Sequence, residues 1–149
     1  MPIIYLTAPT TKPPIPYRDA KTNPEWVACT ASDRAAWTVA AAQRKVADGG
    51  TVAIIAAEVL LAELARALRD SIPYETLDVT DRDQPIVLLS PSLAKGLEFD
   101  HVVLVEPAAI TRQGANRRAY CELYVAMTRP TRTLTYAYSE PLPWPLKAA

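Results

Sequence analysis

Residues 95–106 read Lys-Gly-Leu-Glu-Phe-Asp-His-Val-Val-Leu-Val-Glu, a polar hexapeptide that leads into an apolar run. The run over residues 101–106 is short and continuous, which is typical of a strand buried on both faces of a sheet. Gly96 lacks a Cβ, so the backbone before this strand can turn tightly or approach a ligand closely. Taken alone, the hexapeptide also fits a surface loop in which Leu97 and Phe99 are buried and the charges are solvated.

Strand-like and helix-like patterns alternate on both sides of this segment. Apolar runs predict strands over residues 26–30, 51–56, 72–79, 85–90, 101–106 and 133–138. Helical periodicity predicts helices over residues 33–48, 58–70 and 113–129. Ser32 or Asp33 is expected to cap the first of these helices. The alternation indicates an α/β fold, a mostly parallel sheet with helices on both faces, in which ligands bind at the carboxyl ends of strands.

Composition and proline placement bound the domain organisation. The chain has 149 residues, half of them apolar, and 14 prolines that cluster near both ends. Proline fixes φ and removes a backbone donor, so the ends are expected to be extended. We therefore predict a proline-rich segment over residues 1–24, a compact domain over 25–140 and a proline-rich tail over 141–149. Because no run of about 18 apolar residues and no signal-peptide pattern occurs, we expect a cytoplasmic protein without a membrane span.

Charge and cysteine content exclude some classes of function. Sixteen basic and sixteen acidic residues balance, so contact with nucleic acid would need a local patch or a partner domain. Cys29 and Cys121 lack the spacing of metal ligands, and the chain has one histidine. We therefore expect no metal site and two thiols that behave as small apolar side chains.

A second motif follows the first about thirty residues later. Residues 123–130 read Leu-Tyr-Val-Ala-Met-Thr-Arg-Pro, at the end of the third predicted helix. A guanidinium held at a helix terminus, as at Arg129 or Arg132, can stabilise charge on a transferring phosphoryl group. Arginines near the carboxyl end of a helix are also common because they interact favourably with the helix dipole. Taken alone, the motif favours the second interpretation, whereas the family resemblance that the two motifs carry together implies the first.

Over residues 50–138 the chain resembles the second RecA-like domain of superfamily 1 helicases of the UvrD/Rep type. Residues 51–68 are similar to the strand–helix motif IV of that family, residues 90–100 to motif V and residues 122–132 to motif VI. The proline-rich start and the sequence KGLEFDHVVLVEP are similar to the branch with helicase-IV-like and RNA-polymerase-associated factors. The resemblance implies a RecA-like domain that is incomplete relative to the full two-domain motor.

The resemblance also implies roles for individual residues at an ATP site. Arg129 matches the arginine finger that reaches the γ-phosphate, and Glu98 matches the glutamate that contacts the ribose. Lys95 and Gly96 match the loop beside the nucleotide, and Arg132 matches a position that is commonly basic.

Two further positions are implied to contact single-stranded DNA. Ser90 and Ser92 stand where the family often has threonine and histidine. A serine hydroxyl can still bind a phosphate oxygen, although the histidine is absent.

The chain lacks two parts of a complete ATPase. It contains no phosphate-cradling G-x-x-x-x-G-K-[ST] loop and no strand that ends in Asp-Glu. ATP with Mg²⁺ would therefore need an N-terminal RecA-like domain as partner, and the chain alone is expected to be inactive. Single-stranded DNA and RNA polymerase are the other partners implied.

Two alternatives remain open at this point. The chain could be a non-catalytic docking module that binds a helicase, RNA polymerase or nucleic acid. It could also be an unrelated α/β enzyme, with His101 as its best catalytic candidate. Because His101 opens an apolar strand, we expect it to be a structural residue whose ring is satisfied by hydrogen bonds.

Overall fold

The computed structural model describes residues 23–69, 71, 75–76, 85–113, 116–143 and 146–148. Most of the predicted proline-rich segment over residues 1–24 therefore lies outside the described residues. So does most of the strand predicted over residues 72–79, of which only β3 is described.

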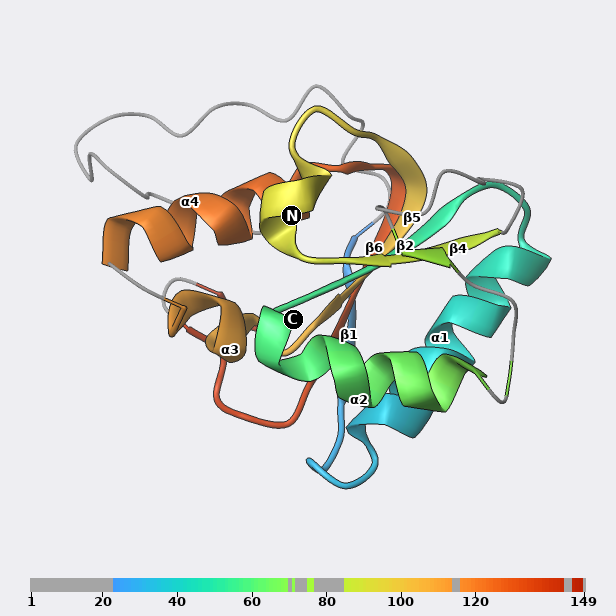
Figure 1. The fold of residues 1–149 in the computed structure, drawn as a ribbon, viewed down its shortest axis with the longest axis horizontal. Helices are drawn as coiled ribbons and strands as arrows, with labels where there is room; N and C mark the ends of the chain where they lie inside the picture. Colours follow the sequence, from blue (N-terminus) through green and yellow to red (C-terminus); the bar gives the residue numbers. More distant parts are fainter. Residues whose placement is uncertain are drawn as a thin grey trace.

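Six parallel strands form a single sheet through the middle of the molecule (Figure 1). Across the sheet they lie in the order β1-β6-β5-β2-β4-β3. Their bounds are Glu25–Ala28 for β1, Val52–Ala56 for β2, Glu75–Thr76 for β3, Ile86–Leu89 for β4, Phe99–Val105 for β5 and Pro130–Tyr138 for β6. The prediction of a parallel α/β sheet is confirmed.

Helices cover both faces of the sheet, as predicted (Figure 1). On one face lie α1 (Arg34–Ala47) and α2 (Glu58–Arg69). On the other lie the short 3₁₀ helix η1 (Pro91–Ala94), α3 (Pro107–Thr111) and α4 (Asn116–Met127).

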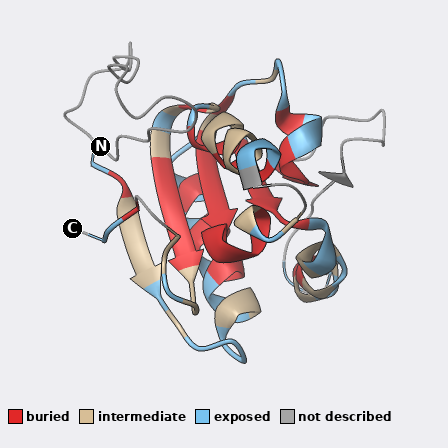
Figure 2. Ribbon diagram, turned by 90° about the vertical axis from the view of Figure 1, so that its left-hand side faces the viewer, coloured by how far each residue is buried: buried red, intermediate tan, exposed pale blue. Residues whose placement is uncertain are grey.

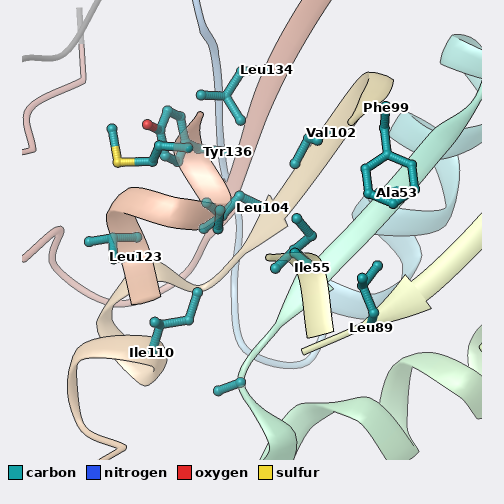
Figure 3. Close-up of a cluster of buried hydrophobic side chains, with 14 of the residues drawn as sticks. Ala53, Ile55, Leu89, Phe99, Val102, Leu104, Ile110, Leu123, Leu134 and Tyr136 are labelled. Atoms are coloured by element: carbon teal, nitrogen blue, oxygen red, sulfur yellow. The ribbon is translucent and has the colours of Figure 1, made fainter. Parts of the chain in front are cut away.

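The hydrophobic core consists of two layers that share the strands. Successive side chains of a strand point to opposite faces, so alternate residues of β2 enter different layers. Ala53 and Ile55 pack with the α3–α4 layer, whereas Val52 and Ile54 pack with the α1–α2 layer. Figure 3 shows the first layer, in which Leu123 of α4 and Ile110 of α3 lie over the sheet. The central strands are buried and the edge strand β1 is only partly so (Figure 2).

Several element bounds differ from the prediction. β5 begins at Phe99 and β6 at Pro130, because these two residues pair with each other before the apolar runs start. The short helix α3 was not predicted, and α4 covers residues 116–127 rather than 113–129. Hydrophobic patterning detects apolar runs, and polar residues at positions 100, 131 and 132 separate Phe99 and Pro130 from the runs that follow them.

The predicted cap of α1 is wrong in its chemistry. Asp33 occupies the N-cap position, but its side chain makes no cap hydrogen bond because its backbone is already helical. Instead, the Thr30 hydroxyl accepts a hydrogen bond from the Asp33 N–H at 3.2 Å.

The described part of the C-terminal tail packs on the domain. Leu146 is buried in the α3–α4 layer, and Leu142 packs against the same layer. The Leu146 N–H donates to the Pro143 carbonyl at 2.8 Å. The predicted domain boundary at residue 140 remains a prediction. No helix within the described residues combines the length and apolarity needed to span a membrane.

Candidate functional site

The two sequence motifs meet where β5 and β6 begin, an edge of the sheet that we call the amino edge. Residues 95–98 connect η1 to β5, and Arg129 directly precedes β6. The Phe99 N–H donates to the Arg129 carbonyl at 3.2 Å, which joins the two segments through their backbones. The structure therefore brings together residues that are some thirty positions apart in the sequence.

The Arg129 side chain is held in place by three hydrogen bonds. Its Nε donates to the Val125 carbonyl at 3.1 Å, and Nη1 donates to the Leu97 carbonyl at 3.3 Å. Its Nη2 donates to the Thr128 hydroxyl at 3.2 Å. A guanidinium carries five N–H groups, so two of them have no partner in the described part of the chain. These two donors are available to an anion, and the group is already oriented.

The loop beside Arg129 presents two opposite charges to solvent. Lys95 and Glu98 are exposed, and neither side chain has an ion-pair or hydrogen-bond partner among the described residues. Gly96 lies between them with φ +76°, a conformation that favours glycine. An extended hydroxyl-bearing ligand could therefore reach the Glu98 carboxylate without displacing a protein contact.

A histidine and an arginine share one backbone acceptor on the same edge. His101 Nε2 lies 2.9 Å from the Gly49 carbonyl, and Arg132 Nη1 donates to that carbonyl at 3.2 Å. A carbonyl only accepts, so Nε2 donates to Gly49, and Nδ1 lies 2.7 Å from the Thr133 hydroxyl. His101 is 1% exposed. The prediction of a satisfied structural histidine is confirmed.

A second contact fixes the turn that contains Gly49. The Thr51 N–H donates to Asp100 Oδ2 at 2.8 Å, and the Asp100 N–H donates to the Thr51 hydroxyl at 3.0 Å. The hydrogen bond from the Thr51 backbone lowers the pKa of Asp100. Gly50 has φ +99°, and a Cβ there would lie 2.5 Å from Asp100 Oδ2. The sequence alone does not reveal this arrangement.

Ser90 and Ser92 lie elsewhere, at the edge where the strands end. Ser90 directly follows β4, is buried, and its hydroxyl lies 3.1 Å from that of Ser92, which is exposed. Ligands in parallel α/β sheets generally bind at the carboxyl ends of strands, but only these two serines among the candidate residues lie at that edge. Residues that precede a strand in a parallel sheet lie at its amino end, and this holds for Glu98 and Arg129.

Sequence reasoning missed a buried carboxylate at this carboxyl edge. Glu106 follows β5, is 0% exposed and has φ 51°. It accepts hydrogen bonds from Ser139 N–H at 3.0 Å, Glu140 N–H at 3.0 Å and Arg34 Nη1 at 2.9 Å, as well as from the Ser139 hydroxyl. Burial favours a raised pKa, but these hydrogen bonds outweigh it and lower the pKa of Glu106. Arg34 also pairs with Glu63.

The described residues also bear on whether the domain itself could hold a metal ion. The described residues contain no cluster of three or more His, Cys, Asp or Glu side chains that could hold a metal ion.

Comparisons with known proteins show where this fold occurs. No protein-family model and no curated protein matches the chain. The C-terminal domain of a possible DNA helicase from Lactobacillus plantarum WCFS1 is 23% identical, with a TM-score of 0.65, over 80% of this chain and 75% of that one.

A viral helicase shares the fold at lower identity. Arterivirus nonstructural protein 10 is 12% identical, with a TM-score of 0.53, over 82% of this chain and 31% of its own. Its complex with DNA matches with a TM-score of 0.52 at 13% identity, over 83% and 32%. This chain therefore spans about a third of the viral protein. These likenesses show that the chain has the RecA-like α/β fold found in helicase C-terminal domains.

Proposed function

We propose that this chain is the C-terminal motor domain of an ATP-dependent DNA helicase or translocase of the UvrD/Rep type. One observation carries the proposal. Arg129 is hydrogen-bonded to the loop that contains Lys95, Gly96 and Glu98, at one edge of a RecA-like sheet. The fold likeness to helicase C-terminal domains supports the same assignment.

The amino edge has donors and acceptors that fit ATP. The two spare N–H groups of Arg129 match the oxygens of a γ-phosphate, where a guanidinium stabilises the charge that develops during transfer. The exposed Glu98 carboxylate can accept hydrogen bonds from ribose hydroxyls. Lys95 and Arg132 add positive charge beside them.

This edge supplies one wall of the site. No metal-holding cluster occurs among the described residues, so Mg²⁺ would be held by the phosphate loop and carboxylates of an N-terminal RecA-like domain. ATP bound between the two domains would draw them together. Arg129 then stabilises the transferring phosphoryl group, and closure moves the protein along a strand.

Single-stranded DNA is the proposed track. Ser92 is exposed beyond the end of β4, where its hydroxyl can donate to a phosphate oxygen. The Ser90 hydroxyl is buried and bonds to Ser92, so its contribution is to orient that hydroxyl. RNA polymerase is a further proposed partner, suggested by the sequence resemblance alone.

The proposal is tested by comparing two purified proteins. The 149-residue chain is expected to hydrolyse ATP negligibly, whereas a protein that also contains the phosphate-loop domain turns it over with Mg²⁺ and DNA. Robust Mg²⁺-dependent turnover by the 149-residue chain would contradict the two-domain site. A reading frame that starts at Met1 and has no partner domain would favour the docking module instead.

A further inference from the structure

The turn between α1 and β2 is fastened to the same two strands that carry the candidate nucleotide residues. Its Gly49 carbonyl accepts hydrogen bonds from His101 of β5 and Arg132 of β6. Thr51, two residues later, makes two hydrogen bonds with Asp100 of β5. Three side chains from two neighbouring strands therefore converge on one short turn.

The turn has little freedom to move. Gly49 and Gly50 both have positive φ, and Asp100 fills the space in which a side chain at Gly50 would lie. His101 is buried and held at both ring nitrogens, so its Nε2–H points at the Gly49 carbonyl in a fixed direction. The acceptor that Arg132 uses is thus placed by the buried His101 and by Asp100, which is partly exposed.

We infer that Asp100 and His101 are positioning residues that place Arg132 as a second phosphate-binding cation beside Arg129. This inference rests on the proposed function of the amino edge. Arg132 is exposed and uses one of its five N–H groups on Gly49, so the others remain for a phosphate. It lies three residues after Arg129, near the same amino end of β6.

A purely structural role predicts a different behaviour. If the network only stabilised the domain, loss of the His101 bond would lower the melting temperature without changing ligand contacts at Arg132. If it positions Arg132, a side chain that restores the bond to Gly49 restores ligand binding as well. Glutamine at position 101 can donate from its amide to the same carbonyl, whereas valine cannot.

The experiment is an NMR titration of the 149-residue chain with Mg²⁺-ATP. The side-chain Nε–H signals of Arg129 and Arg132 and the amides of Gly50 and Thr51 are followed in wild type, His101→Gln, His101→Val and Arg132→Gln. Amide signals of α2 and the melting temperature report whether each variant is folded. We expect all four signals to respond with one apparent Kd in the wild type.

The variants then separate the possibilities. His101→Val is expected to weaken binding roughly three- to tenfold, the value of one hydrogen bond, and His101→Gln to stay near wild type. Arg132→Gln is expected to weaken binding by the same factor. Because it changes an exposed side chain, it can be measured even if His101→Val fails to fold. Shifts at Arg129 with none at Arg132, Gly50 or Thr51 would overturn this inference alone. No shift at any of them would contradict this inference and also nucleotide binding by the amino edge of the isolated chain.

Discussion

Replacing Glu106 with glutamine should destabilise the domain far more than any surface charge change. Glu106 is fully buried and is held by Arg34, Ser139 and Glu140 at once. Glutamine has the same shape but no charge, and its amide N–H groups would face the donors of Arg34 or Ser139. Removing one partner of a buried ion pair leaves the other charge uncompensated, which strongly lowers the free energy of unfolding.

The expected loss is about 2–4 kcal/mol of unfolding free energy. Breaking a buried pair costs about 3–5 kcal/mol, and Arg34 recovers part of this because it keeps Glu63 as a partner. The amide oxygen of glutamine can also still accept from one backbone N–H. Glu106 has φ 51°, which costs about 1–2 kcal/mol for a non-glycine residue. Glycine at this position would relieve that strain but would lose every contact of the carboxylate.

Glu140→Gln is the matched control. It removes the ion pair between Glu140, which is 40% exposed, and Arg112, which is 58% exposed. We therefore expect a loss of about 0–1 kcal/mol of unfolding free energy. Urea unfolding, followed by tryptophan fluorescence, measures both. With a slope of about 2 kcal/mol/M, the Glu106→Gln midpoint should fall by roughly 1–2 M.

The pH dependence gives an independent check. Folding lowers the pKa of Glu106, so its stabilisation is present above the unfolded pKa of about 4.3. It is lost as the pH falls through the lower, folded pKa. The gap between wild type and Glu106→Gln should therefore narrow in acid. A Glu106→Gln midpoint within error of Glu140→Gln at neutral pH would refute the reasoning.

Two further predictions concern the turn and the core, and both are read from unfolding curves. Gly50→Ala should cost about 2–3 kcal/mol, because its Cβ would lie 2.5 Å from Asp100 Oδ2, and Gly49→Ala, with open space around it, about 1–2 kcal/mol. Equal losses would show that contact with Asp100 is unimportant. Leu104→Ala should cost about 2–5 kcal/mol as a 0% exposed core residue. Val59→Ala, at 77% exposed, should change stability by less than about 0.5 kcal/mol.

The fold was predictable where a strand is buried along its whole length and its sequence is a continuous apolar run. All five residues of β2 and all four of β4 are buried, and the corresponding apolar runs were recognised as strands. The prediction failed where pairing decides the structure instead. Phe99 and Pro130 join their strands through sheet register, which depends on the partner strand and leaves no local signal.

The members of the candidate site stay a prediction from motif order, and their geometry could not be predicted from the sequence. The motif order pointed to Glu98 and Arg129, and the structure places their segments in contact. The turn at Gly49 and the carboxylate at Glu106 were missed, because both depend on contacts between residues more than thirty positions apart. Only the three-dimensional arrangement also shows that Ser92 lies at the opposite edge from Arg129.

The most direct measurement is the effect of Arg129→Ala on ATP turnover by a protein that contains this chain and the proposed N-terminal RecA-like domain. An arginine finger contributes about 10³–10⁵-fold to kcat, so turnover should fall at least about 10³-fold while the melting temperature stays near wild type. Arg66→Ala removes an exposed arginine on α2 and serves as the control, with turnover unchanged. Turnover of a folded Arg129→Ala enzyme within about tenfold of wild type would contradict the role of Arg129 as the catalytic wall of an ATP site.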